Sequence, residues 1–301
     1  MIGLALAAAA AAAAQPQVVL TVDPRHRLVE GVASDGKTIW LSSVLDRQLL
    51  ACRSRCRTLA TLPSGIHPFA IAWDEHRRRL WVAADCPPGV SAIKACDRGA
   101  LMAFSPVGRI ISRMAPPSGS FHPGDVSASA GRVFVSDSQN GAVYELAKSG
   151  YSLVPIVPPG VGKSGQGTAL DADGQKLLVA DYSQGVAGVD LGTGARRILP
   201  RPDGKPLRGV DGMARCGTVY FGIYNGSTPG ALLTIDARAT TLTFDQPLPA
   251  PLPDPTQVAY DGKRLLIVAD SGWATIDKPG FVRTVGATVI AVPLGADCIP
   301  R

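Results

Sequence analysis

Long apolar runs, a serine nucleophile motif and a phosphate-binding loop are all missing from this 301-residue sequence. Beyond the first residues, no stretch reaches the roughly 20 apolar residues of a membrane-spanning helix, so we expect no membrane insertion. A G-x-S-x-G nucleophile elbow is absent, which argues against serine hydrolases of that kind. The segment Gly160-Val-Gly-Lys163-Ser164 fails as a phosphate loop, because Val157 stands where the first glycine is needed.

Basic residues are in excess, giving a formal net charge of +6, yet they are scattered. Their clusters are small and lack the interleaved aromatic residues of a base-stacking surface. These clusters are Arg53/Arg55/Arg57, Arg77 to Arg79, and Arg196/Arg197. We therefore expect no nucleic-acid partner and interpret the clusters as solvated turns and faces.

Turn-forming residues are abundant instead. The chain has 33 Gly and 25 Pro, and 46% of its residues are hydrophobic. That composition favours short strands with frequent turns and a packed core over an α-helical protein.

The first 14 residues form an apolar, Ala-rich run that ends in small residues. We interpret residues 1–14 as a signal peptide cut near Ala14, with a disordered Ala-rich tail as the alternative. No Cys follows the cleavage site, so a lipoprotein anchor is not indicated. The expected location is periplasmic or secreted, with residues 15–301 as one domain.

The six cysteines fit an exported protein. Neighbourhood in the sequence suggests the pairs Cys52/Cys56 and Cys86/Cys96, which leaves Cys216/Cys298 as a long-range pair, although six cysteines allow 15 connectivities. A zinc site is the alternative, but the spacing matches structural zinc sites poorly and no His is near. Disulfides in an oxidising compartment are favoured.

One pattern recurs six times: a lead residue, small or apolar positions, a turn with Asp or Gly, and a β-rich run often ending in Ala-Asp or Ser-Asp. Successive lead residues are about 45 positions apart. They are Glu30, Phe69, Asp125, Gln166, Asp211 and Thr256. Each unit predicts a four-stranded antiparallel sheet.

Six such sheets bury both of their faces when they pack around an axis, so the pattern predicts an all-β, six-bladed β-propeller. The segment Val18–Val22 is expected beside Thr288–Val292, which would close the ring by placing both chain ends in one blade. A seven-bladed ring or a β-sandwich are the alternatives.

The innermost strand of each blade lines the channel, so the lead residues are expected to form a ring near one mouth. Three of the six are carboxylates, which repel one another unless a cation or shared protons compensate. Oxygen ligands suit a hard divalent ion such as Ca²⁺ or Mg²⁺, with Zn²⁺ or Mn²⁺ also open. The alternative is a water-filled polar channel without metal.

The segments Glu30-Gly31, Gln166-Gly167 and Asp211-Gly212-Met213 resemble the senescence marker protein/gluconolactonase family, also called regucalcin-like. The resemblance implies a six-bladed propeller in which Glu30, Gln166 and Asp211 hold one divalent metal, Gln166 standing where the family has Asn. It further implies a catalytic base, Asp211 or Asp125, that accepts a proton from the water attacking an ester or lactone. Gly124 stands where the family has a substrate-contacting Asn.

Six further residues are candidates for substrate binding. His67 and His122 precede lead positions, and the other four lie on rim loops. Those four are Tyr182, Tyr224, Asn225 and Trp273. Ordinary loop packing is the alternative for each.

The function expected from these features is an exported metal-dependent hydrolase of the lactonase/esterase type, acting on a small molecule in the central channel. One alternative is a non-catalytic propeller that binds a small ligand or a protein through its rim loops. A propeller lyase or isomerase is another. The oligomeric state stays open.

Overall fold

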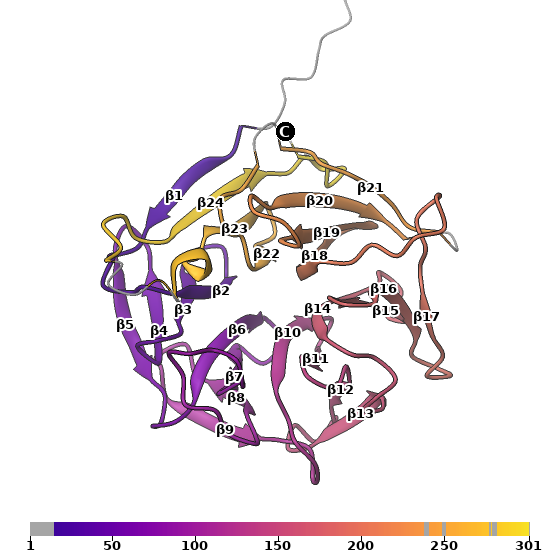
Figure 1. The fold of residues 1–301 in the computed structure, drawn as a ribbon, viewed down its shortest axis with the longest axis horizontal. Coiled ribbons are helices and arrows are strands. Elements are labelled where there is room, and N and C mark those ends of the chain that lie inside the picture. Colours follow the sequence, from indigo (N-terminus) through magenta and orange to yellow (C-terminus); the bar gives the residue numbers. More distant parts are fainter. Residues whose placement is uncertain (1–14, 238–240, 249–250, 277, 279–281, 301) are drawn as a thin grey trace, which may run out of the picture.

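The computed structural model describes residues 15–237, 241–248, 251–276, 278 and 282–300. Six four-stranded antiparallel sheets stand around a common axis, as Figure 1 shows. The six-bladed propeller predicted from the repeats is therefore confirmed. The expected signal peptide, residues 1–14, lies outside the described residues.

The first three blades follow one another along the chain, each running from its innermost strand outward. Blade one contains β2 Val29–Ser34, β3 Ile39–Ser43, β4 Gln48–Cys52 and β5 Cys56–Thr61. Blade two contains β6 His67–Asp74, β7 Arg79–Asp85, β8 Ala100–Phe104 and β9 Ile110–Met114. Blade three contains β10 Pro123–Ser129, β11 Arg132–Asp137, β12 Val143–Leu146 and β13 Leu153–Val157.

The remaining blades complete the ring. Blade four contains β14 Gly165–Leu170, β15 Lys176–Asp181, β16 Gly185–Asp190 and β17 Arg196–Ile198. Blade five contains β18 Val210–Cys216, β19 Val219–Tyr224, β20 Ala231–Asp236 and β21 Thr243–Asp245. Blade six contains β22 Val258–Tyr260, β23 Arg264–Asp270, β24 Thr288–Pro293 and, from the other end of the chain, β1 Gln17–Thr21.

Blade six joins the two ends of the chain, as the sequence predicted. Strand β1 pairs antiparallel with β24, and Gln17 lies opposite Ala291 while Thr21 lies opposite Thr288. The first and last parts of the chain therefore close the ring by backbone hydrogen bonds.

The core lies between neighbouring blades, where the apolar faces of adjacent sheets meet. Trp81 and Ala83 of blade two, for example, pack in one cluster with Val133 and Val135 of blade three, and all four are fully buried. Each second strand is almost entirely buried, because sheets cover it on both faces. Burial on both sides explains why these strands read as continuous apolar runs in the sequence.

The Asp that ends several of these strands accepts hydrogen bonds from the backbone of the loop that follows. Asp137 accepts hydrogen bonds from the backbone N–H groups of Gln139 and Asn140, at 2.9 and 3.1 Å. Asp181 likewise accepts one from the backbone N–H of Gln184 at 3.0 Å. The repeated Ala-Asp and Ser-Asp endings thus hold loops at one mouth of the channel.

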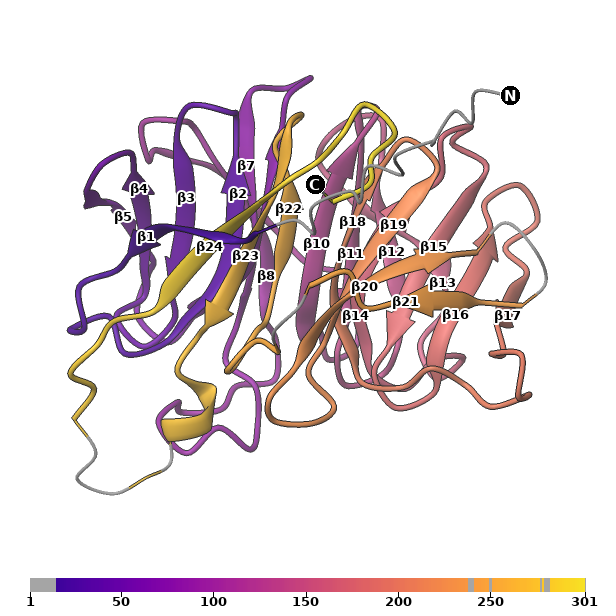
Figure 2. The same cartoon turned by 90° about the horizontal axis from the view of Figure 1, so that it is seen from above.

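The helical content of the described chain is one short 3-10 turn, η1 Trp273–Thr275. Figure 2 shows this coil standing out from one face of the ring. Among the residues described, no helix has the length and apolar character needed to cross a membrane.

All six cysteines pair as their neighbourhoods predicted, forming Cys52–Cys56, Cys86–Cys96 and Cys216–Cys298. The third pair ties β18 of blade five to the C-terminal segment. Disulfides of this number fit an oxidising compartment.

The disulfide with the longest loop should contribute most to stability. Cys216 and Cys298 are 82 positions apart, so by chain entropy their link is worth about 4 to 5 kcal/mol. The double change Cys216→Ser/Cys298→Ser should lower Tm by roughly 10 °C in calorimetry. Cys52→Ser/Cys56→Ser removes a link across only four positions and is the matched control; an equal loss from both would contradict the expectation.

Candidate functional site

Five of the six innermost strands carry a β-bulge where they open toward the channel. The pairing with the second strand skips two residues at the same place in each blade, which turns those residues out of the ladder. The skips lie between Val29 and Val32, Pro68 and Ile71, Pro123 and Val126, Gly165 and Thr168, and Val210 and Met213. In blade six, Thr256 and Gln257 take the corresponding place just before β22. Each blade thus presents a first and a second bulge residue.

The bulges correct the alignment of blade three. The repeat pattern predicts Asp125 as the lead residue, yet Asp125 is the second bulge residue and Gly124 the first. The hydrogen bonds agree, because the backbone N–H of Asp125 donates to Ser136 Oγ at 3.1 Å just as that of Gly31 donates to Ser42 Oγ at 2.7 Å. Asp125 therefore lies one residue further along its strand than the other predicted site residues.

The first bulge residues form the ring that the sequence predicted, with Gly124 in place of Asp125. They are Glu30, Phe69, Gly124, Gln166, Asp211 and Thr256. Thr256 Oγ1 donates to the backbone oxygen of Glu30 at 2.7 Å. A Cβ at Gly124 would stand 2.8 Å from Gln166 Oε1, so the absence of a side chain there makes room for the Gln166 amide.

The second bulge residues are Gly or Ala in four blades, namely Gly31, Ala70, Gly167 and Gly212. In blades three and six they are the larger polar residues Asp125 and Gln257. Gln257 of blade six donates from Nε2 to Asp125 Oδ1 of blade three at 2.8 Å. Blades three and six are opposite in a six-membered ring, so this hydrogen bond crosses the axis.

The Gln257 side chain is fixed at its other atom as well. Its Oε1 accepts the backbone N–H of Val32 at 2.8 Å and that of Ile71 at 3.4 Å. A Cβ at Gly31 would stand 2.5 Å from the backbone oxygen of Phe69 and 3.0 Å from Gln257 Oε1, which explains the glycine there. Gln257, which the sequence pattern did not single out, thus reaches across the axis and links blade six to blades one, two and three.

Glu30, Asp125 and Asp211, which we call the acidic cluster, are buried, and all three have raised pKa values. Burial, followed by repulsion from Asp211, raises the pKa of Asp125 to about 8. Burial also raises the pKa of Asp211 to about 7. The pKa of Glu30 lies well above its ordinary value because of burial and repulsion by Asp211, Asp254 and Asp125.

Each carboxyl of the acidic cluster is oriented by one side-chain N–H donor. Trp273 Nε1 donates to Glu30 Oε2, and Asn225 Nδ2 donates to Asp211 Oδ2 at 2.8 Å. Gln257 does the same for Asp125. The other oxygens, Glu30 Oε1, Asp211 Oδ1 and Asp125 Oδ2, accept no hydrogen bond from the described residues.

The predicted rim residues Trp273, Asn225 and Tyr182 lie around this cluster. The Trp273 ring stacks on Phe69 with ring centroids 6.4 Å apart. Asn225 Nδ2 also donates to the backbone oxygen of Pro255 at 3.1 Å, and Tyr182 donates from its hydroxyl to the backbone oxygen of Asn225 at 3.3 Å. Asp211 contributes to the raised pKa of Tyr182, after burial.

Tyr224 lies one residue before Asn225 and packs against the apolar cluster between blades four and five. Its ring stands 3.1 Å from where a Cβ at Gly209 would be and 3.2 Å from one at Gly226. The two glycines thus make room for this ring beside the Asn225 loop.

The two predicted histidines make their hydrogen bonds away from the acidic cluster. His67 Nδ1 contacts the backbone oxygen of Val44 at 2.8 Å. His122 Nδ1 contacts Asp85 Oδ1 at 3.1 Å, and burial raises the pKa of that carboxyl to about 6. Both rings are anchored to loops of the same mouth.

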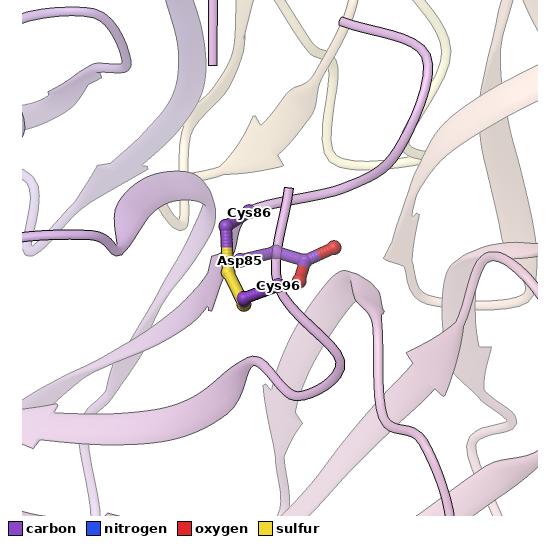
Figure 3. Close-up of side chains that lie close together, drawn as sticks. All are labelled: Asp85, Cys86 and Cys96. Carbon is purple, nitrogen blue, oxygen red and sulfur yellow. A yellow bond between two sulfur atoms is a disulfide. The ribbon is translucent and has the colours of Figure 1, made fainter. Parts of the chain in front are cut away.

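Asp85 also lies close to two sulfur atoms. Asp85 Oδ, Cys86 Sγ and Cys96 Sγ are within 4.8 Å of one another, as in a metal site. Figure 3 shows, however, that the two sulfurs are bonded to each other. All six cysteines are in disulfides, so the zinc alternative has no thiolate ligands.

A cavity of about 530 Å³ opens at the opposite mouth of the channel. It is lined by later residues of the inner strands, from Val32, Ile71 and Val126 onward, and Gln257 forms part of its wall. The acidic cluster does not line it. Gln257 therefore separates this cavity from the acidic cluster.

No protein-family profile matches the sequence, and no curated protein matches it. Solved structures do resemble it. A gluconolactonase from Xanthomonas campestris is 18% identical, with a TM-score of 0.64, covering 94% of this chain and 90% of that one. A calcium-binding protein, regucalcin, from Agrobacterium tumefaciens is 16% identical, with a TM-score of 0.61, covering 93% of both chains.

The same fold also occurs with another chemistry. Virginiamycin B lyase from Staphylococcus aureus is 10% identical, with a TM-score of 0.58, covering 94% of this chain and all of that one. Similarity at these identities is a statement about architecture. The chain therefore shares the six-bladed fold of gluconolactonase and regucalcin structures.

Proposed function

We propose that the protein is an exported, metal-dependent hydrolase of the lactonase/esterase type that acts on a small molecule at the acidic cluster. One observation carries the proposal: buried carboxyls from separate blades converge at one level of the channel. Glu30 comes from blade one and Asp211 from blade five, and repulsion between them contributes to the raised pKa of Glu30. Keeping such groups together is costly without a cation or a proton.

The residues present fit a divalent cation. Glu30 and Asp211 each keep one oxygen free of hydrogen bonds from described residues while the other oxygen is anchored. Among the described residues, the charged groups that shift the pKa of Glu30 are all carboxyls, and no lysine or arginine is among them. Oxygen donors of this kind suit Ca²⁺, Mg²⁺ or Mn²⁺, with Zn²⁺ also accepted.

Glu30 and Asp211 would hold the ion, with the Gln166 amide oxygen as a further ligand. When bound, the ion would supply Lewis-acid polarisation of an ester or lactone carbonyl. Asp211 would also accept a proton from the attacking water. Asp125, with a pKa of about 8, is suited to return a proton to the leaving alkoxide.

Export is supported by the three disulfides, because structural disulfides persist mainly in oxidising compartments. The proposed signal peptide at residues 1–14 belongs to the same proposal. The similar structures include a gluconolactonase and a calcium-binding protein, and both properties agree with the chemistry proposed for the cluster.

Divalent cations are expected to bind the purified protein and to support lactone hydrolysis. Calorimetric titration with Ca²⁺, Mg²⁺, Mn²⁺ and Zn²⁺ after chelation should give a one-to-one complex with at least one ion. Chelation should lower kcat/KM at least about 100-fold, since polarisation of the carbonyl is worth several kcal/mol.

Glu30→Gln is the test variant for this binding, because it keeps the acceptor for Trp273 and removes the charge. We expect it to weaken cation affinity at least about tenfold, the loss of one charged ligand. Glu75→Gln changes a carboxyl whose side chain is 72% exposed and serves as control. A protein that binds none of the four ions would contradict the proposal.

A further inference from the structure

The cavity at the mouth opposite the acidic cluster takes no part in the proposed hydrolysis. Its volume is about 530 Å³. Sites that hold small organic molecules have volumes of roughly 300 to 1,000 Å³. All six blades contribute to its wall, so it lies on the axis of the ring. The cavity is therefore large enough to be a second binding site.

The cavity is wide because the inner strands carry small side chains at one level. The third residue after the first bulge residue is serine in blade three and alanine in the other five blades, and all six residues line the cavity. They are Ala33, Ala72, Ser127, Ala169, Ala214 and Ala259. Larger side chains at this level would fill the space around the axis.

The deep part of the cavity offers mainly carbon atoms to a ligand. Next to the small residues its wall consists of aliphatic side chains such as Val32, Ile71 and Val126. The hydroxyls of Ser127 and Thr168 are hydrogen-bonded to each other at 2.5 Å. An apolar group that enters the cavity is thus removed from water, which favours its binding.

Two hydrogen-bond donors lie further out, on the neighbouring blades five and six. Arg215 and Tyr260 are each the fourth residue after the first bulge residue of their blade, and both line the cavity. Nη1 of Arg215 donates to the backbone oxygen of Gly217, the one hydrogen bond that this side chain makes to the described residues. The hydroxyl of Tyr260 makes none to them. Both side chains therefore keep donors for a ligand.

The carboxylates that line the cavity are already engaged by the protein. Three form ion pairs, namely Asp74 with Arg77, Glu75 with Arg78 and Asp261 with Arg264. The fourth, Asp35, accepts the backbone N–H groups of Lys37 and Thr38 at 3.0 and 2.7 Å. Asp35 belongs to blade one, which blade six separates from Arg215. None of the described carboxyls pairs with Arg215, so an anionic ligand group has a partner there.

We propose that this cavity is a second binding site, which takes a small molecule with an apolar body and one carboxylate. The apolar body lies among the small and aliphatic residues, and the carboxylate accepts hydrogen bonds from Arg215 and Tyr260. The site does not depend on hydrolysis at the acidic cluster, because that cluster does not line the cavity.

Octanoate is the probe for this site, and acetate and 1-octanol are the comparisons. Calorimetric titration of the protein as purified should show one octanoate bound per chain, at least about tenfold more tightly than either comparison. Acetate lacks the apolar body, and 1-octanol lacks the charge that pairs with a guanidinium. Equal or tighter binding of acetate or of 1-octanol would overturn the proposal.

Arg215→Gln tests the partner of the carboxylate. It should weaken octanoate binding at least about tenfold and leave 1-octanol binding unchanged, since only the charged ligand uses the guanidinium. Arg215→Lys keeps the positive charge and should lose less. Arg197→Gln changes an exposed arginine on the outer strand β17 and is the matched control. Unchanged octanoate binding in Arg215→Gln would show that octanoate binds elsewhere, for example to a cation at the acidic cluster, and the proposal would be wrong.

Ala128→Leu tests the apolar part, because Ala128 lines the cavity and the change adds three carbon atoms to its wall. Octanoate and 1-octanol should both bind at least about tenfold more weakly to this variant, since the space is occupied. Unchanged binding of both would place them outside the cavity and contradict the proposal. If Ala128→Leu does not fold, the ligand preference of the wild type and the Arg215 variants decide the question.

Discussion

Asp211→Asn is expected to lower kcat/KM at least about 1,000-fold while raising the Tm of the metal-free protein above pH 7. The activity falls because a cation ligand and a proton acceptor are lost together. The stability rises because a buried carboxyl is replaced by a neutral group of the same shape, whose oxygen still accepts from Asn225 Nδ2.

The gain in stability has a defined pH dependence. The pKa of Asp211 is about 7 in the folded protein, above its ordinary value of 3.8. From pH 4 to 7 the unfolded chain therefore loses a proton that the folded chain keeps, and the wild-type native state loses stability as pH rises. The loss is on the order of 4 kcal/mol, or at least about 5 °C in Tm.

Differential scanning calorimetry in chelator checks this at two pH values. The variant and the wild type should have nearly the same Tm at pH 4 and should separate by pH 8. Asp245→Asn, on the exposed edge strand β21 of the same blade, is the matched control and should leave Tm unchanged at both. If Asp211→Asn is less stable than the wild type at pH 8, ionisation of the Asp211 carboxyl does not destabilise the metal-free protein.

Gln257→Met should lower kcat at least about tenfold with little change in KM, and should destabilise the protein by about 1 to 3 kcal/mol. Met has a similar length but no donor or acceptor. It leaves Asp125 Oδ1 without its side-chain donor and the backbone N–H of Val32 without its acceptor. The carboxyl of Asp125 then loses the contact that orients it.

Gln257→Glu separates the two bonds, because a carboxylate still accepts from Val32 but cannot donate to Asp125. We expect its kcat to fall as far as in Gln257→Met, or further, since two carboxyls now face each other. Gln175→Met, on an exposed turn of blade four, is the control. Steady-state kinetics and calorimetry of the three variants test this expectation. An unchanged kcat in both Gln257 variants would show that Asp125 does not need the hydrogen bond from Gln257.

The repeat pattern was enough to predict the architecture, because six units of similar length can bury their apolar faces only by packing around an axis. Ring closure followed from two β-rich segments at the chain ends, which the structure pairs as β1 and β24. Two of the disulfides were predicted because their cysteines lie close together in the sequence. Cys216 and Cys298 were then the two cysteines left to pair.

The candidate site was predicted only in part, because a bulge changes which residue faces the channel by one position. The pattern aligned Asp125 with Glu30 and Asp211, whereas the bulge aligns it with Gly31 and Gln257. One signal was available: the residue after the lead is Gly or Ala in four units and Gln in blade six. A long amide among small residues marks a side chain that reaches across the space they leave.

The hydrogen bond between Gln257 and Asp125 also stabilises the ring across its diameter. The two residues are 132 positions apart in the chain and belong to opposite blades that share no backbone pairing. Separation of blades three and six requires this bond to break, so it holds the ring together across the axis as the pairing of β1 with β24 does along the circumference.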